Sequence, residues 1–312
     1  MTFSPADDFT QFLRLVVFEN SRHIRREAIA LTTLKIGGIH LHYEILGSGE
    51  PIFLNNGASS TCHSWDPQLK WLTNNYKIII HDARGQGLTS APCGEAQNSY
   101  EMLAEDLNHL MEHLNIERAI IGGSSMGGGV SHTFALKYPQ KVKALILSDN
   151  VGHGITKPGV QVSHEEKERL RKKREYVIHK YGVIEWAYRE MEMAQQSVIE
   201  PTVEQMIRLQ RMAKLSVNSA IYSYRFITGT KVPGIEGTKD LTMPVLIIIG
   251  DEDENLAGAE WLRDTIPNRR YALLGKAGHP TRYTKPDSWR QATEEFLEDL
   301  KSERNIRKEC IY

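Results

Sequence analysis

The chain has 312 residues, of which 40% are hydrophobic and 25% are charged, and its formal net charge is −1. This length is enough for one large domain with an insertion and a sizeable core, and the balanced charge gives no electrostatic reason to expect nucleic acid or an anionic membrane as a partner. The three cysteines, Cys62, Cys93 and Cys310, are too few and too irregularly spaced for a disulfide framework or a zinc site. We therefore expect free thiols in a reducing, cytoplasmic compartment.

A helical extension is predicted over residues 1–32. Phe9, Leu13, Val16 and Val17 recur at helical spacing, which indicates an amphipathic helix that packs either on the core or on a second subunit of a homodimer. Charged residues interrupt the apolar stretch, so it does not have the pattern of a signal peptide. No stretch approaches the roughly twenty apolar residues that cross a bilayer.

Strand and helix signals alternate from residue 33 onwards. Residues 33–36 and 39–45 flank Gly37 and Gly38, a pattern that predicts an edge hairpin. Short apolar runs predict further strands, beginning near Pro51, Lys77, Arg118, Lys143 and Pro244. Strands separated by helices favour an α/β fold, with a mostly parallel central sheet flanked by helices.

The most informative motif is a G-x-S-x-G pattern, formed by Gly123, Ser125 and Gly127 within residues 118–130. It follows an apolar run and opens a small-residue helix, so it predicts a sharp strand-to-helix turn with the serine at its apex. Small neighbours let such a turn close without clashes. The hydroxyl of Ser125 then stands clear of the fold as a nucleophile.

A base and an orienting acid are expected downstream, because a serine hydroxyl is a poor nucleophile until its proton is removed. A buried run at residues 244–250 leads to Asp251 and Asp253. A second predicted strand, near residues 271–274, leads to His279. The three groups therefore follow one another in the order Ser, Asp, His.

The alternation of strands and helices stops over residues 152–239. This stretch contains no clear strand and has two helix-capping boxes, which begin at Ser163 and Thr202. It predicts a helical cap inserted between two segments of the core, residues 33–151 and 240–312. Such a cap would lie over the strand ends that carry the serine, exclude water and set substrate choice.

Four motifs of this chain resemble those of the α/β-hydrolase family, and the resemblance covers residues 35–300. In that family the acid lies in a G-x-x-D pattern after a strand and the base in a GH pair. The resemblance therefore implies that Asp253 orients and His279 acts as the base, with Ser125 as nucleophile. Asp149, at the end of an earlier predicted strand, lies where some relatives place their acid, and it is the alternative.

The resemblance also implies an oxyanion hole made of two backbone amides. These are assigned to Met126, directly after the nucleophile, and to Ala58, in the loop after the strand at residues 51–54. Asn56 departs from the pattern, because the family usually has His before Gly57. Asn tolerates turn conformations and can donate and accept hydrogen bonds, so the turn is expected to survive.

Residues 82–89, DARGQGLT, resemble the D-x-R-G-x-G-x-S turn of the same family, to which a structural role is assigned. Its Asp and Arg are expected to tie loops together by charge-assisted hydrogen bonds. A phosphate-binding loop would need a lysine after the last glycine and a helix directly behind it, so nucleotide binding is rejected. The resemblance implies no cofactor. The sequence lacks an H-E-x-x-H motif, so a metal enzyme is disfavoured.

The resemblance implies a capped serine hydrolase that cleaves a carboxylic ester or lactone of small to medium size through an acyl-enzyme. Two alternatives remain open. The same triad could perform perhydrolysis, carbon-carbon bond hydrolysis or a lyase reaction, or the chain could be a binding protein that reads a small ligand in a hydrolase-like pocket. The expected partner is a small-molecule substrate, and neither nucleic acid nor a membrane is expected as a partner.

Overall fold

The computed structural model describes residues 32–58, 60–90, 99–150, 164–183, 221 and 236–312. The chain divides into two compact units, residues 1–32 and 33–312. The helix predicted over residues 1–32 lies outside the described residues, and so does most of the cap predicted over residues 152–239. Both remain predictions.

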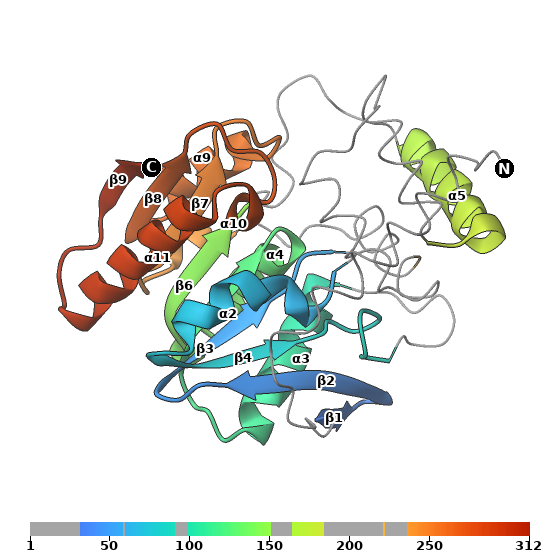
Figure 1. The fold of residues 1–312 in the computed structure, drawn as a ribbon, viewed down its shortest axis with the longest axis horizontal. Coiled ribbons are helices and arrows are strands. Elements are labelled where there is room, and N and C mark those ends of the chain that lie inside the picture. The colour runs from blue at the N-terminus through green and yellow to red at the C-terminus, as the bar shows by residue number, and fades with distance from the viewer. Residues whose placement is uncertain (1–31, 59, 91–98, 151–163, 184–220, 222–235) are drawn as a thin grey trace, which may run out of the picture. The chain divides into compact units, whose positions relative to one another are not determined.

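A nine-stranded sheet forms the centre of the second unit, in the order β1-β2-β4-β3-β5-β6-β7-β8-β9 (Figure 1). β1 pairs antiparallel with β2, and β2 with β4, whereas every other neighbouring pair is parallel. The predicted edge hairpin and the mostly parallel sheet are thus confirmed. The strands are β1 (Thr33–Ile36), β2 (Ile39–Leu46), β3 (Glu50–Asn55), β4 (Tyr76–His81), β5 (Ala119–Ser124), β6 (Val142–Ser148), β7 (Val245–Gly250), β8 (Arg269–Leu274) and β9 (Lys308–Ile311).

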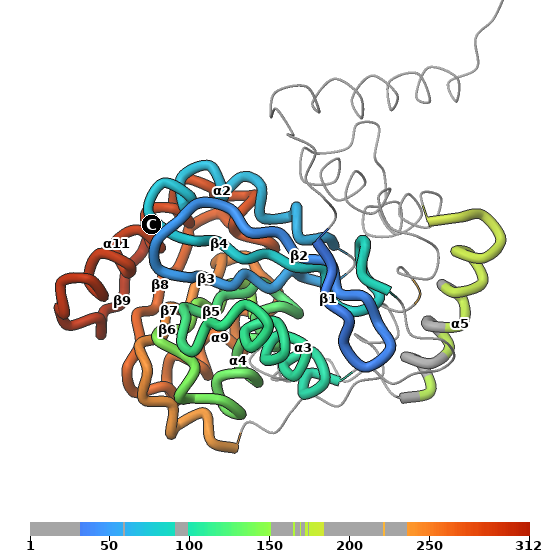
Figure 2. The backbone as a smooth tube through the Cα atoms, turned by 90° about the horizontal axis from the view of Figure 1, so that it is seen from below, coloured from blue at the N-terminus to red at the C-terminus, as the bar shows by residue number. Residues whose placement is uncertain are grey.

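Helices cover both faces of the sheet (Figures 1 and 2). One face packs against α3 (Tyr100–His113), α4 (Met126–Lys137) and α9 (Leu256–Thr265). The other packs against α2 (Asp66–Leu72) and α11 (Pro286–Lys301). The remaining described helices are α5 (His164–Tyr181), α10 (Thr281–Thr284) and the 3-10 helices η1 (Cys62–Trp65), η2 (Pro139–Lys141) and η3 (Thr238–Asp240).

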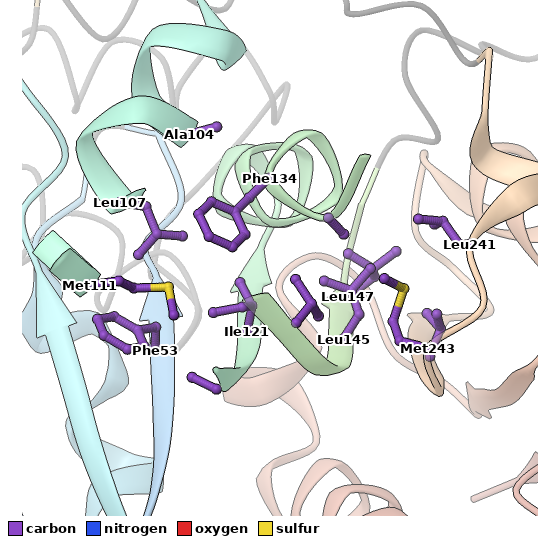
Figure 3. Close-up of a cluster of buried hydrophobic side chains, with 14 of the residues drawn as sticks. Phe53, Ala104, Leu107, Met111, Ile121, Phe134, Leu145, Leu147, Leu241 and Met243 are labelled. Atoms are coloured by element: carbon purple, nitrogen blue, oxygen red, sulfur yellow. The ribbon is translucent and has the colours of Figure 1, made fainter. Parts of the chain in front are cut away.

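The core consists of two apolar layers, one on each face of the sheet. Successive side chains of a strand point to opposite faces, so Phe53 of β3 joins the layer under α3 and α4, while Ile52 and Leu54 join the opposite layer. Figure 3 shows the first layer, in which the Phe134 ring of α4 points toward Ile121 of β5. Burial on both faces explains why these strands are continuous apolar runs without a polar alternation.

The parallel pairing gathers the candidate site residues at one edge of the sheet. β5, β6, β7 and β8 run side by side in the same direction, so their carboxyl ends meet. Ser125 and Asp149 come directly after β5 and β6, while Asp253 and His279 follow β7 and β8 within a few residues. In open α/β sheets this edge is where ligands bind.

The structure adds a strand that hydrophobic patterning did not predict. β9 pairs parallel with β8 although three of its four residues are exposed. Its place depends on backbone hydrogen bonding to the sheet edge, which leaves no apolar pattern in the sequence.

The described part of the chain tests in part the expectations of free cysteines and of no membrane-spanning segment. Cys62 is a buried free thiol and Cys310 is a half-buried one, whereas Cys93 lies outside the described residues. None of the described helices has the length and apolar character needed to cross a bilayer.

The buried ring of Phe134 provides a test of this packing. Phe134→Ala should lower the free energy of unfolding by about 3–5 kcal/mol, because it removes apolar contacts and leaves a cavity between α4 and the sheet. The exposed Gln140→Ala is the control and should stay within about 0.5 kcal/mol of the parent. Denaturant unfolding measures both, and equal stability of the two variants would contradict the described core.

Candidate active site

Ser125 occupies the turn between β5 and α4 with a strained backbone. Its φ is 57° and its ψ is −122°, a region that residues with a side chain rarely adopt. The turn is tight enough that a Cβ added to Gly123 would lie 2.1 Å from the carbonyl oxygen of Gly127, and one added to Gly127 would lie 2.2 Å from that of Asn55. The two glycines therefore allow the close approach, and the predicted strand, turn and helix are confirmed.

Asp253 and His279 are in direct contact. The Oδ2 atom of Asp253 lies 2.9 Å from the Nδ1 atom of His279. A carboxylate can only accept, so this contact places the ring proton on Nδ1 and leaves Nε2 as the basic nitrogen. The Asp253 side chain is fully buried and also accepts from the backbone amide of Asn255, at 2.8 Å, whereas the His279 side chain is 30% exposed.

The surroundings of His279 raise its pKa above the ordinary value. Burial disfavours the imidazolium form, but the hydrogen bond to Asp253 and the negative charges of Asp149 and Asp253 outweigh that effect. The imidazolium is therefore stabilised where it would form on accepting a proton.

Asp149, the alternative acid, has a different set of partners. Its Oδ1 accepts from the Thr281 backbone amide at 2.9 Å and from the Thr281 hydroxyl at 2.7 Å. Its Oδ2 accepts from the hydroxyls of Ser124 at 2.9 Å and Ser148 at 2.8 Å. Of the two candidate acids, Asp253 is the one hydrogen bonded to His279, and Asp149 fixes the segment that carries the histidine.

Arg282 extends this network, although no sequence pattern pointed to it. Its buried guanidinium donates to the hydroxyl of Ser124, the residue before the candidate nucleophile. It also lies 4.7 Å above the Trp65 ring, a cation-π distance. The end of β5, the end of β6 and the segment after His279 are thereby joined through buried polar side chains.

The loop after β3 passes beside Ser125. A Cβ added to Gly57 would lie 3.6 Å from the Cβ of Ser125. Ala58 and Met126, the two residues assigned to the oxyanion hole, belong to one small apolar cluster. The structure therefore brings both residues to the neighbourhood of the candidate nucleophile.

Asn56 supports this loop through its side-chain amide. Its Nδ2 donates to the Ser60 carbonyl at 2.9 Å and to the Oε1 of Gln86 at 3.0 Å. Gln86 Oε1 also accepts from the Ser60 amide, and Gln86 Nε2 faces the Met126 sulfur at 3.7 Å. Asn56 thus supplies the loop with hydrogen bonds at the position where the sequence departed from the expected His.

The turn at residues 82–89 is structural, as predicted. Arg84 makes a two-point contact with the Asp106 carboxylate, at 2.8 and 2.5 Å. Asp82 accepts from the backbone amides of Cys62 at 2.7 Å and Leu88 at 2.9 Å. These charge-assisted bonds hold together the loops around the candidate site.

Among the described residues, the hydroxyl of Ser125 makes no hydrogen bond to His279. The structure thus brings Asp253 and His279 into contact and places Ser125 at the same edge of the sheet. Hydrogen bonds between a nucleophile and its base are often longer before substrate binds and shorten in the complex.

Comparison with known proteins matches residues 50–173 to the family described as the α/β hydrolase fold. The chain is 25% identical over 260 residues to a Bacillus subtilis protein that carries the name 2-succinyl-6-hydroxy-2,4-cyclohexadiene-1-carboxylate synthase. The aligned region covers 81% of this chain and 92% of the relative.

Two solved structures show the same fold. A thermophilic esterase from Thermogutta terrifontis, solved with malate bound, superimposes with a TM-score of 0.68 and 26% sequence identity. The match covers 87% of this chain and 98% of the esterase chain. The enol-lactonase from Burkholderia xenovorans LB400 superimposes with a TM-score of 0.69 and 21% sequence identity. The match covers 86% of this chain and 100% of the enol-lactonase chain. With the strand order and the turn at Ser125, these likenesses show that the chain has the α/β-hydrolase fold.

Proposed function

We propose that this protein is a serine hydrolase that cleaves carboxylic esters or lactones of small to medium size through an acyl-enzyme. The observation that carries the proposal is the combination at one sheet edge of a strained serine turn with a buried carboxylate bound to an imidazole. Ser125 supplies the nucleophile, His279 the base and Asp253 the orienting acid.

In the acylation step, Nε2 of His279 takes the proton of the Ser125 hydroxyl while the oxygen attacks the substrate carbonyl carbon. The imidazolium that forms is stabilised by Asp253, and the oxyanion is stabilised by the backbone amides of Ala58 and Met126. The imidazolium then gives its proton to the departing alkoxide, and the ester bond breaks. In a lactone the leaving alcohol stays attached to the acyl group.

In the deacylation step, His279 takes a proton from water, and the hydroxide attacks the acyl-enzyme. The imidazolium returns the proton to the oxygen of Ser125 as the acid departs. The base therefore ends each cycle neutral, so the enzyme needs a histidine that is neutral at rest and stabilised when charged. The Asp253 contact meets the second requirement.

The substrate class is supported by the solved relatives. One is named as an esterase and another as an enol-lactonase, and both share the fold over more than four-fifths of this chain. Substrate size is proposed to be set by the cap over residues 152–239.

A second candidate rests on the Bacillus subtilis relative, which is named as a synthase of a cyclohexadiene carboxylate and aligns over 81% of this chain. In that reading His279 and Ser125 move protons within a carboxylate substrate, and water is not consumed. Product analysis in ¹⁸O-labelled water separates the two, because only hydrolysis places the label in the product acid.

Ser125→Ala should lose about three or more orders of magnitude in turnover of p-nitrophenyl esters or lactones, because the acyl-enzyme cannot form. Wild type should show an initial burst of nitrophenol wherever deacylation is slow. The exposed Ser302→Ala is the matched control and should keep full activity. Unchanged turnover in Ser125→Ala, with its fold intact by circular dichroism, would refute the assigned nucleophile.

Asp253→Asn should lower kcat/KM by about three to four orders of magnitude, since it removes the carboxylate that fixes the His279 ring. Asp149→Asn keeps that contact and should reduce kcat/KM less, while lowering the melting temperature through its four hydrogen bonds. A larger kinetic loss in Asp149→Asn than in Asp253→Asn would transfer the role of acid to Asp149.

The pH profile of kcat/KM should have an acidic limb set by His279. The base acts only when neutral, so activity is lost as pH falls through its pKa, and the raised pKa puts the midpoint above about 6.5. Asp253→Asn removes the carboxylate that raises the pKa, so the midpoint of its residual activity should move down. A midpoint that does not move would contradict the electrostatic role of Asp253.

A further inference from the structure

A second cluster of ligand-type side chains lies outside the candidate catalytic residues. It consists of His42 and Glu44 of β2 and Cys62 of η1. One imidazole nitrogen, one carboxylate oxygen and the thiol sulfur of these three residues all lie within 4.8 Å of one another. The cysteine count and spacing excluded a zinc site built from cysteines, but the fold adds a histidine and a glutamate to one cysteine.

The backbone holds the three side chains in place from two directions. His42 and Glu44 are two residues apart on one strand and therefore project to the same face. The backbone amide of His42 donates to the Thr89 hydroxyl at 2.8 Å, and that of Cys62 donates to Asp82 at 2.7 Å. Both elements are thus anchored independently of any ion between them.

The cluster is buried at one end and open at the other. The side chain of His42 is 2% exposed and Cys62 is fully buried, whereas the side chains of Glu44 and His63 are 12% and 27% exposed. This gradient provides an entry path from solvent to the sulfur and the imidazole.

His63 lies at the open end of the cluster, between two carboxylates. Its Nε2 is 3.2 Å from the Oε1 of Glu44, and its Nδ1 is 3.2 Å from the Oδ1 of Asp66. Carboxylates that bind a metal are commonly held by an outer hydrogen bond of this kind, so His63 positions the Glu44 carboxylate.

One buried atom of the cluster lacks an explanation by hydrogen bonding. Among the described residues, the Nδ1 atom of His42 is buried without a hydrogen-bond partner. The other ring nitrogen reaches Glu44 only at 3.4 Å, the long end of a hydrogen bond. Buried polar atoms usually have a hydrogen-bond partner. An exception such as this nitrogen favours a water or an ion as its partner.

We propose that His42, Glu44 and Cys62 bind a divalent transition-metal ion of the Zn²⁺ or Co²⁺ class. The mixed sulfur, nitrogen and oxygen donors suit these borderline ions and disfavour Mg²⁺ and Ca²⁺, which take oxygen ligands. Tetrahedral bonds of about 2.0–2.3 Å place ligand atoms about 3.3–3.8 Å apart, which falls within the 4.8 Å that encloses the three ligand atoms here.

Binding requires the Cys62 thiol to lose its proton, which passes to the solvent, because the thiolate is the ligand. The bound ion would then join β2 to the segment that continues from the loop of Ala58, four residues before Cys62. The proposed role is therefore structural, and it does not depend on the catalytic assignment of Ser125.

The direct test is titration of the reduced, untagged full-length protein with Co²⁺, followed by optical absorption. Wild type should bind one equivalent and show a thiolate-to-cobalt charge-transfer band with tetrahedral d-d bands, which Zn²⁺ then displaces. Cys62→Ser should lose the charge-transfer band, and Glu44→Gln should bind at least about tenfold more weakly. Cys310→Ser keeps the cluster and should behave as wild type.

His279→Gln is the second control, because Asp149, Asp253 and His279 form another group of ligand-type atoms. It should bind Co²⁺ as wild type does. Absence of stoichiometric binding by wild type, or a charge-transfer band that survives Cys62→Ser, would overturn the proposal.

X-ray absorption of the Zn²⁺-loaded wild type tests the same claim without substitutions, in case Cys62→Ser does not fold. One sulfur with nitrogen and oxygen neighbours in the first shell is the expected result. A shell of nitrogen and oxygen alone would contradict the site.

Discussion

The buried carboxylate of Asp149 is the interaction on which the geometry of the candidate site depends. It joins the end of β5 through Ser124, the end of β6 through Ser148 and the segment after His279 through Thr281. A charge buried in this way is tolerated only when hydrogen bonds replace its water, and here four donors do so. Because the donors come from three separate segments, satisfying the charge also fixes the distance between the serine turn and the histidine loop.

This anchoring complements the strain at Ser125. A residue held at a positive φ costs about 1–3 kcal/mol and persists only where its surroundings determine it. Here the close contacts at Gly123 and Gly127 leave no room for another backbone path, and the Ser125 amide donates to the Ser148 carbonyl at 2.9 Å. Part of the stability of the sheet thus offsets the strain of this half-buried serine turn, and a second contact, between Asp253 and His279, orients the proposed base.

Local sequence predicted the parts of this arrangement that are local in the chain. The turn at Ser125 is encoded by glycines two residues away, and His279 was assigned because the pair Gly278-His279, a few residues after a strand, resembles a motif of the family. The partnership between Asp149 and Thr281 joins residues 132 positions apart through side chains, so no pattern in the sequence reports it. The cluster around Cys62 escaped for the same reason, since strand pairing and loop packing create it, and the exposed strand β9 carries no apolar signal.

The central claim, that the fold holds Ser125 as an activated nucleophile, is tested most directly by covalent trapping. A fluorophosphonate probe should modify the wild type once, and peptide mass spectrometry should locate the adduct on Ser125, with labelling slowed strongly in His279→Gln. This result is expected because only a serine beside a base reacts at neutral pH. An adduct on another residue, or equal labelling in the two proteins, would contradict it.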